Sequence, residues 1–340
     1  MAWKIKAIVL AVLVAATGFA GAAYADPFPI RIGWVQTPGH MAPVIEELAN
    51  RHPELFKHLG QSYTMQPIRF NGTTPQIQAQ AIEELEIASQ APSALALAIG
   101  NAHLDERIVA DVLSDGHGDY YSENFVVMAD GGIKTIEDVK GKRIATNTIG
   151  SASDSAMRTM FRKHGIQDAD FTTVETNFAN MPAMLDGGKV DMIGVLPQFA
   201  DGIVGDDKYK VLFTARDAVG PTQAVMWAIR AKTIAAHREA FVDFFEDYIR
   251  AIRWFLDPTN HKEAVAICAE VTKLPEQRLD YAFTKADFYH SPDALPDVAL
   301  VQREIDEAVE LKVLPKPVTV DPQYVDLSLV QEAKRRLDGK

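Results

Sequence analysis

The chain has 340 residues, of which 47% are hydrophobic and 24% charged, an ordinary balance for a globular protein. Its 46 acidic and 34 basic residues give a formal net charge of −12. This charge argues against nucleic acid or an anionic membrane as a partner, because both attract a basic face. The single cysteine, Cys268, allows no internal disulfide and is predicted to pack in the core rather than to act as a nucleophile.

The first 25 residues have the pattern of a signal peptide. Lys4 and Lys6 precede an uncharged apolar run, and Ala23-Tyr24-Ala25 fits the small-x-small cleavage pattern. A transmembrane anchor is the alternative, but Gly and Ala dilute the apolar run. Cleavage after Ala25 leaves 315 residues with a net charge of −14, and no cysteine follows that could carry a lipid. We therefore expect a periplasmic protein, too long for one compact core.

Strands and helices alternate in the first part of the mature chain. Short apolar runs predict strands, and apolar residues at three-and-four spacing predict helices. Alternation of this kind is typical of an α/β architecture with a mainly parallel sheet covered on both faces. The expected strands cover residues 29–35, 63–70 and 86–91, and the expected helices cover residues 41–52, 75–85 and 92–101.

The same alternation continues, and from about residue 233 the chain is expected to be mainly helical. A long segment at 237–256 has apolar and aromatic residues at helical spacing, which indicates a core helix. A short helix followed by a strand is expected within 135–147. Further strands are expected at 123–129, 170–176, 189–195, 208–215 and 223–231, and further helices at 153–165 and 180–188.

A repeated order of predicted elements in two segments indicates two similar lobes. Residues 81–94 and 183–200 both show a helix, an acidic or glycine-rich turn, a short apolar strand and a turn that contains proline. We expect lobe 1 to comprise residues 26–123 plus 222–340, and lobe 2 to comprise residues 124–221. The chain would then cross between the lobes near 124–127 and 223–227, and the two crossings would act as a hinge.

The turn at residues 147–155 is the strongest candidate for a binding site. Ligands of open α/β sheets bind beyond the carboxyl ends of the strands, where the next helices begin. A helix cap needs one hydroxyl, but Asn147, Ser151 and Ser153 crowd several donors beside Gly150. The turn is therefore predicted to hold an anion at the helix start, provided that Asp154 points away.

Four other turns supply weaker candidates. Gly39 and His40 follow the first strand, where His40 could donate to an anion or simply be solvated. Gln90 and Ser93 follow the strand at 86–91, and Ser93 could instead only cap a helix. The last candidates come from lobe 2, where each follows a strand: Asn177 and Gln198.

The sequence carries no pattern typical of catalysis or of a metal site. It lacks G-x-S-x-G and H-E-x-x-H, and its turn at 149–156 lacks the second glycine and the Lys-Ser/Thr pair of a P-loop. Its nine histidines are scattered. We therefore expect neither a metal nor a cofactor, and His40 is the one candidate for a catalytic base.

Three segments resemble a known family: "IRIGWV" at 30–35, "TIEDVKGKRIATNTIGSASD" at 135–154 and "MLDGGKVDMIGVLPQF" at 184–199. The chain resembles the substrate-binding proteins of bacterial ABC importers, in the family of nitrate-, alkanesulfonate- and taurine-type receptors, which also includes the thiamine-pyrimidine synthase fold. The resemblance implies a type II periplasmic binding protein fold with two α/β lobes joined by two crossover strands. It also implies that Ser151 and Ser153 hold the anionic head, faced by the turns at 39–40 and 90–93.

The expected function is therefore that of a periplasmic solute-binding protein and not of an enzyme. As a monomer it would capture a small organic anion, such as a sulfonate, a carboxylate or nitrate, and deliver it to an ABC permease and ATPase at the inner membrane. Two alternatives stay open: an exported enzyme that uses His40, or a sensor-linked binding module, for example for a pyrimidine or an aromatic acid. The first-lobe segment "EELEIASQ" lacks the glycine that many relatives have there, so the ligand is not fixed.

Overall fold

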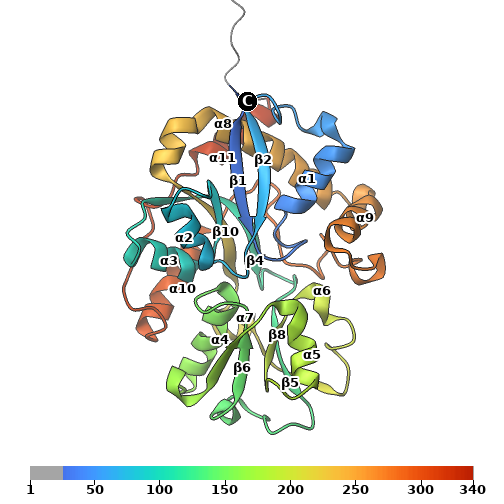
Figure 1. Cartoon of the computed structure of the whole chain (residues 1–340), viewed down its shortest axis with the longest axis vertical. Coiled ribbons are helices and arrows are strands. Elements are labelled where there is room, and N and C mark those ends of the chain that lie inside the picture. The colour runs from blue at the N-terminus through green and yellow to red at the C-terminus, as the bar shows by residue number, and fades with distance from the viewer. Residues whose placement is uncertain (1–25, 340) are drawn as a thin grey trace, which may run out of the picture.

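The computed structural model describes residues 26–339, so the predicted signal peptide lies outside the described residues. Figure 1 shows two lobes stacked along the long axis of the molecule. Lobe 1 carries a five-stranded sheet in the order β2-β1-β3-β10-β4, and lobe 2 carries a three-stranded sheet, β8-β5-β9, and a pair, β6-β7. The strands of lobe 1 are β1 (Phe28–Trp34), β2 (Tyr63–Arg69), β3 (Ile87–Gln90), β4 (Glu106–Asp115) and β10 (Thr222–Arg230).

The sheets are mixed, so the expectation of a mainly parallel sheet is wrong in one respect. Strand β1 runs parallel to β2 and β3, but β10 runs antiparallel to both β3 and β4. In lobe 2, β5 is antiparallel to both its neighbours. The reason is that β5 and β10 each follow a crossing between the lobes: they start at the cleft and run away from it. The strands of lobe 2 are β5 (Asn124–Met128), β6 (Arg143–Thr146), β7 (Thr172–Glu175), β8 (Ile193–Val195) and β9 (Tyr209–Thr214).

Helices cover the sheets in both lobes (Figure 1). The long helix α8 packs its aromatic residues on β10, where Trp227 lies 4.3 Å from Tyr248 between ring centroids. Burying each such side chain stabilises the fold by about 1.5–3 kcal/mol. Lobe 1 contains α1 (Ala42–Arg51), α2 (Pro75–Ala81), α3 (Pro92–Gly100), α8 (Ala231–Leu256), α9 (His261–Thr272), α10 (Val298–Glu310) and α11 (Ser328–Leu337). Lobe 2 contains α4 (Ala152–Lys163), α5 (Met181–Asp186), α6 (Pro197–Ala200) and α7 (Ala215–Val219).

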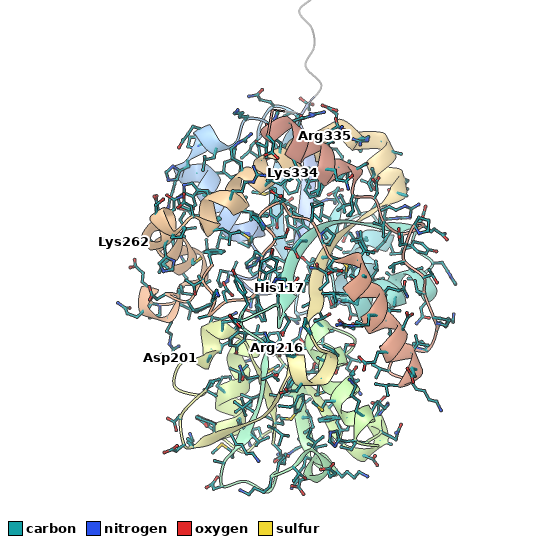
Figure 2. All side chains as sticks on the ribbon, turned by 180° about the vertical axis from the view of Figure 1, so that it is seen from behind. His117, Asp201, Arg216, Lys262, Lys334 and Arg335 are labelled. Atoms are coloured by element: carbon teal, nitrogen blue, oxygen red, sulfur yellow. The ribbon has the colours of Figure 1, made fainter. Side chains whose placement is uncertain are left out.

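The two crossings lie slightly earlier in the chain than expected. The first is formed by residues 116–123, between β4 and β5, and the second by residues 220–221, between α7 and β10. The end of the first crossing is bonded to the start of α7, because the amide of Ala215 donates to the carbonyl of Glu123 at 2.8 Å. Figure 2 shows His117 of the first crossing and Arg216, just before the second, at the waist of the molecule.

Two further observations concern single features of the chain. Cys268 is fully buried within α9, and burial raises the pKa of its thiol, as expected for a packing residue. Between residues 26 and 339, no helix is both long and apolar enough to span a membrane.

Candidate functional site

A cavity of about 810 Å³, including the part open to solvent, lies between the lobes. Lobe 1 lines it with the turn after β1 and the cleft ends of β4 and β10, and lobe 2 lines it with the start of α4 and the turn after β8. The cavity thus lies where strands from both lobes end, which is where α/β sheets bind ligands. Six of the residues singled out from the sequence line it: Gly39, His40, Asn147, Ser151, Ser153 and Gln198.

The turn after β6 uses most of its donors internally. The hydroxyl of Ser151 accepts from the amide of Asp154 at 3.4 Å, as an N-cap, and donates to Oδ1 of Asn147 at 2.7 Å. Asp154 turns away from this cavity: its Oδ2 accepts from Nε of Arg158 at 2.8 Å, beside another hollow. Its carboxylate therefore does not oppose a ligand in the cleft, as the sequence analysis required.

Three of the predicted residues instead join the lobes to each other. The hydroxyl of Ser93 donates to the carbonyl of Gly150 at 2.9 Å, and Nδ2 of Asn147 donates to the carbonyl of Asn71 at 3.0 Å. Nε2 of Gln198 donates to the carbonyl of Thr37 at 3.3 Å. Together with the bond from Thr74 to the carbonyl of Ile149, at 3.1 Å, these contacts form the interlobe clasp. They hold the lobes closed over the cavity.

Two of the predicted residues lie away from the cavity. Gln90 is fully buried behind it, and its Nε2 donates to Oε1 of Gln80 at 3.3 Å. Asn177 caps the short helix at 178–180 by accepting from the amide of Asn180 at 3.1 Å. Neither residue lines the cleft, and Ser93 does not line it either. Each of these side chains forms a hydrogen bond outside the cleft instead.

Four buried carboxyl groups that the sequence analysis missed line the cavity: Asp115, Glu123, Asp287 and Glu304. The hydroxyl of Ser153 donates to Oε1 of Glu123 at 2.6 Å, and the hydroxyl of Thr222 donates to Oε2 of Glu304. Their positions in the chain are far apart, so no local pattern could have grouped them. Among residues 26–339, no Lys or Arg lines this cavity.

The carboxyl groups differ in how fully they are bonded. Both oxygens of Asp287 accept backbone amides, from Phe283 at 2.9 Å and from Phe288 at 2.8 Å. Oδ2 of Asp115 accepts the amide of Glu123 at 3.0 Å, but Oδ1 has no hydrogen-bond partner in the described part of the chain. A buried acceptor without a partner is costly, so Oδ1 of Asp115 is a polar atom in the cavity wall that the described residues leave unsatisfied.

Burial dominates the electrostatics of these groups. It raises the pKa of Glu123 to about 8, although the hydroxyl of Ser153 opposes the shift. It also raises the pKa of Glu304 to about 7 and that of Asp115 to about 6. A low-dielectric site disfavours the charged form of a carboxyl, so these groups favour a nearby positive charge.

His40 presents an acceptor to the cavity. Its Nδ1 lies 3.2 Å from Oγ of Ser89, and that hydroxyl gives its proton to the carbonyl of Gly33 at 2.6 Å. Nδ1 is therefore the donor in the contact with Ser89, which leaves Nε2 as an acceptor. Burial lowers the pKa of His40 to about 3, so the ring is neutral at neutral pH.

Comparison with known families agrees with the resemblance inferred from the sequence. Residues 119–260 match the model of the family described as NMT1/THI5 like. This stretch begins in the first crossing, contains lobe 2 and ends in the helices that follow β10. No curated protein sequence matches the chain significantly.

Several solved structures share the fold over nearly the whole chain. The alkanesulfonate-binding protein SsuA of Xanthomonas axonopodis pv. citri, bound to MOPS, has a TM-score of 0.67 at 19% identity, over 88% of this chain and 98% of its own. The ligand-binding component of an ABC-type import system of Staphylococcus aureus has a TM-score of 0.66 at 16% identity, over 91% and 99%. The periplasmic nitrate-binding protein NrtA of Synechocystis PCC 6803 has a TM-score of 0.67 at 12% identity, over 93% and 90%. The predicted two-lobe periplasmic binding protein fold is thus confirmed.

Proposed function

We propose that this chain is the solute-binding component of an ABC importer, which captures a small molecule between its lobes and delivers it to a membrane permease. The cavity lined from both lobes, with the lobes clasped over it, carries this proposal. A ligand that contacts both lobes binds the closed state better than the open state, and therefore shifts the population toward closure. The closed outline is then the signal that a permease recognises.

The partners and the compartment follow from the same proposal. The chain works as a monomer in the periplasm after its signal peptide is removed, and it docks transiently on a permease and its ATPase. Support comes from the solved structures of the same fold, which include an alkanesulfonate-binding protein, a periplasmic nitrate-binding protein and the binding component of an import system. The likeness to these proteins supports the class of function rather than a particular ligand.

Binding accounts for the cleft better than catalysis does. A general base works best when its pKa lies near the working pH, but burial lowers the pKa of His40 to about 3. The partner of its Nδ1 is the hydroxyl of Ser89 and not a carboxylate that could stabilise an imidazolium. His40 is thus better suited to accept a hydrogen bond from a ligand than to accept a proton from it.

Native mass spectrometry of the mature chain, purified without dialysis from its own periplasm, tests this function. We expect one small molecule per chain, which is released by denaturation. Adding that compound back to the refolded chain should lower the radius of gyration in small-angle scattering. A chain that carries no small molecule and does not contract with any fraction of the periplasmic extract would contradict the proposal. Uptake of the compound, lost when the gene is deleted, distinguishes an importer from a sensor-linked module.

A further inference from the structure

We infer that the ligand of this cleft is an organic cation, a protonated amine or amidine, rather than the anion expected from the sequence; this inference rests on the proposed function. Three carboxyl groups converge on the cavity from separate segments: Asp115 at the end of β4, Glu123 in the first crossing and Glu304 on α10. Each is at most 5% exposed.

The charges around the cavity are one-sided. The nearest cations are Arg216 and Arg303, and neither lines the cavity. Arg216 donates to the carbonyls of Gly118 and Tyr120, and Arg303 donates to the carbonyls of Val219 and Pro221. Among the described residues, neither forms an ion pair with these carboxyl groups. Burial raises the pKa of Asp115 and of Glu304, although the charges of Arg216 and Arg303, respectively, oppose the shift.

Three hydroxyl groups of the cavity wall that could have served an anion are already in use. Ser153 and Thr222 each direct a proton to a glutamate, and Ser151 directs its proton to Asn147. Among the buried polar side-chain atoms of the lining residues, those left without a partner are Oδ1 of Asp115, an acceptor, and Oγ1 of Thr73, a hydroxyl that can donate or accept. Nε2 of His40 is a second acceptor. A ligand with several N–H donors matches these acceptors, whereas the oxygens of a sulfonate or nitrate would be repelled by the lone pairs of the same acceptors.

A metal ion is a poorer match than an organic cation. Within residues 26–339, no group of three His, Cys, Asp or Glu side chains is arranged to hold a metal. The acceptors are instead spread along a cavity whose other walls are apolar, including Leu113, Val225 and Phe288. Such walls suit a ligand with a carbon body, and a charged nitrogen at one end would face the carboxyl groups.

Two pairs of probes that differ in charge test the inference by calorimetry at fixed ionic strength. They are benzylammonium against benzenesulfonate, and butylammonium against butanesulfonate. We expect each ammonium to bind at least about tenfold more tightly than the sulfonate of the same skeleton, since each charge-assisted hydrogen bond contributes a difference of that order. Tighter binding of the sulfonates would overturn the cation and leave the solute-binding function intact. Failure of all four probes, and of the co-purified compound, to bind would overturn both.

A pair of variants on one helix locates the effect. Glu304→Gln keeps the shape of the side chain but removes its charge from the cleft, so ammonium affinity should fall about tenfold. Glu310→Gln is the control, because Glu310 lies at the end of the same helix, exposed and outside the cleft. Melting curves show that both variants fold. Equal ammonium affinity in Glu304→Gln, Glu310→Gln and the wild type would contradict the assignment of the charge to this site.

Discussion

Glu123 occupies a space that only a glycine on the facing strand leaves open. A Cβ atom at Gly194 in β8 would lie 2.3 Å from Oε1 of Glu123 and 3.1 Å from the hydroxyl of Ser153. Neither group can retreat freely, because each is buried and bonded to the other. The absence of a side chain at Gly194 therefore fixes where the carboxyl group sits in the cleft.

Gly194→Ala should accordingly disturb the site and lower stability. Overpacking of a buried position costs roughly 1–3 kcal/mol in the free energy of unfolding. Urea denaturation of the ligand-free chain measures this cost. Gly100→Ala serves as the control, because its added Cβ would meet its nearest neighbour, Cγ2 of Val318, at an ordinary 3.6 Å. Equal stability of the two variants would show that Glu123 is not held where the structure places it.

The raised pKa values of the cleft carboxyl groups make stability depend on pH. Between pH 4.5 and about 8, Glu123 is ionised in the unfolded chain but holds its proton in the folded one. The folded state then binds more protons, so stability falls as pH rises through this window. The same effect on stability extends to about pH 7 for Glu304 and Asp287, and to about pH 6 for Asp115.

Two buried histidines oppose this trend at lower pH. Burial lowers the pKa of His40 to about 3 and that of His290 to about 4. Below their ordinary pKa of about 6.5, the unfolded chain therefore binds more protons at these two residues, and their contribution to stability rises with pH up to that value. Because the carboxyl groups outnumber them, the ligand-free chain should melt at a higher temperature at pH 5 than at pH 8. Glu123→Gln should reduce this difference and match the wild type near pH 5. A melting temperature that increases steadily from pH 5 to pH 8 would refute the assignment.

Residue types in local patterns predicted the turns of the site but not their partners. The Ser-rich turn at 151–155 does face the cleft, since a strand end followed by a helix start is a local feature. The carboxyl groups at 115, 123, 287 and 304 were not predicted, because only the folded chain brings these four segments together. For the same reason, the hydroxyl of Ser153 was expected to bind a ligand rather than Glu123, and Thr222 was not singled out.

At the scale of elements, strand β4 is the clearest omission of the sequence analysis. Its sequence, "ERIVADVLSD", places acidic residues among apolar ones and fits neither simple alternation nor a helix. The strand is nevertheless buried, because Asp111 accepts from Gln223 and from the amide of Ser291. A strand that buries Asp111 with donors from distant segments gives no local signal.

Elements with a regular apolar pattern were predicted well. The spacing in α1, α4 and the later part of α8 placed each within a few residues of its observed bounds. Helix α8 begins at Ala231, close to residue 233, where the chain was expected to become helical, and it has a non-helical residue at His237. His237 stacks on Phe28 with ring centroids 3.7 Å apart, a tertiary contact that the pattern could not contain.

The loop before α2 brings the two lobes into close contact at Gly72. A Cβ atom there would lie 2.7 Å from Cβ of Thr148 and 3.0 Å from Nδ2 of Asn147, both in lobe 2. Gly72→Ala should therefore keep the lobes apart without disturbing either core. We expect a larger radius of gyration in small-angle scattering, and affinity for the co-purified compound reduced by about tenfold or more. A variant that closes and binds like Gly100→Ala would exclude a role for this contact in closure.

At the scale of the whole molecule, the limits of the two lobes stay predictions, although the sheets divide in the same way. All strands between β5 and β9 pair within lobe 2, and β10 returns to the sheet of lobe 1. The carboxyl groups Asp115 and Glu123 flank the first crossing, and Thr222 follows the second. The cluster that we assign to the ligand thus lies at the hinge itself, so binding there is coupled to the angle between the lobes.

Fluorescence energy transfer between labels on the two lobes measures that angle directly. Figure 2 shows Lys262 of lobe 1 and Asp201 of lobe 2 on the same flank, on either side of the cleft. The native Cys268 is fully buried, so maleimide dyes should react with Lys262→Cys and Asp201→Cys alone. Asp201 takes part only in an exposed ion pair with Arg278, at 3.9 Å, whose loss costs little.

Transfer between these labels should increase when the co-purified compound is added, because closure brings the two flanks together. A pair within lobe 1, Lys262→Cys with Arg335→Cys, controls for effects of the compound on the dyes and should not change. If the cleft recognises a cation, the concentration needed for half-maximal transfer should fall as pH rises from 5 to 8, since binding then no longer has to displace protons from Glu123 and Glu304. An anionic ligand would give the opposite slope, because each ionised carboxyl would repel it.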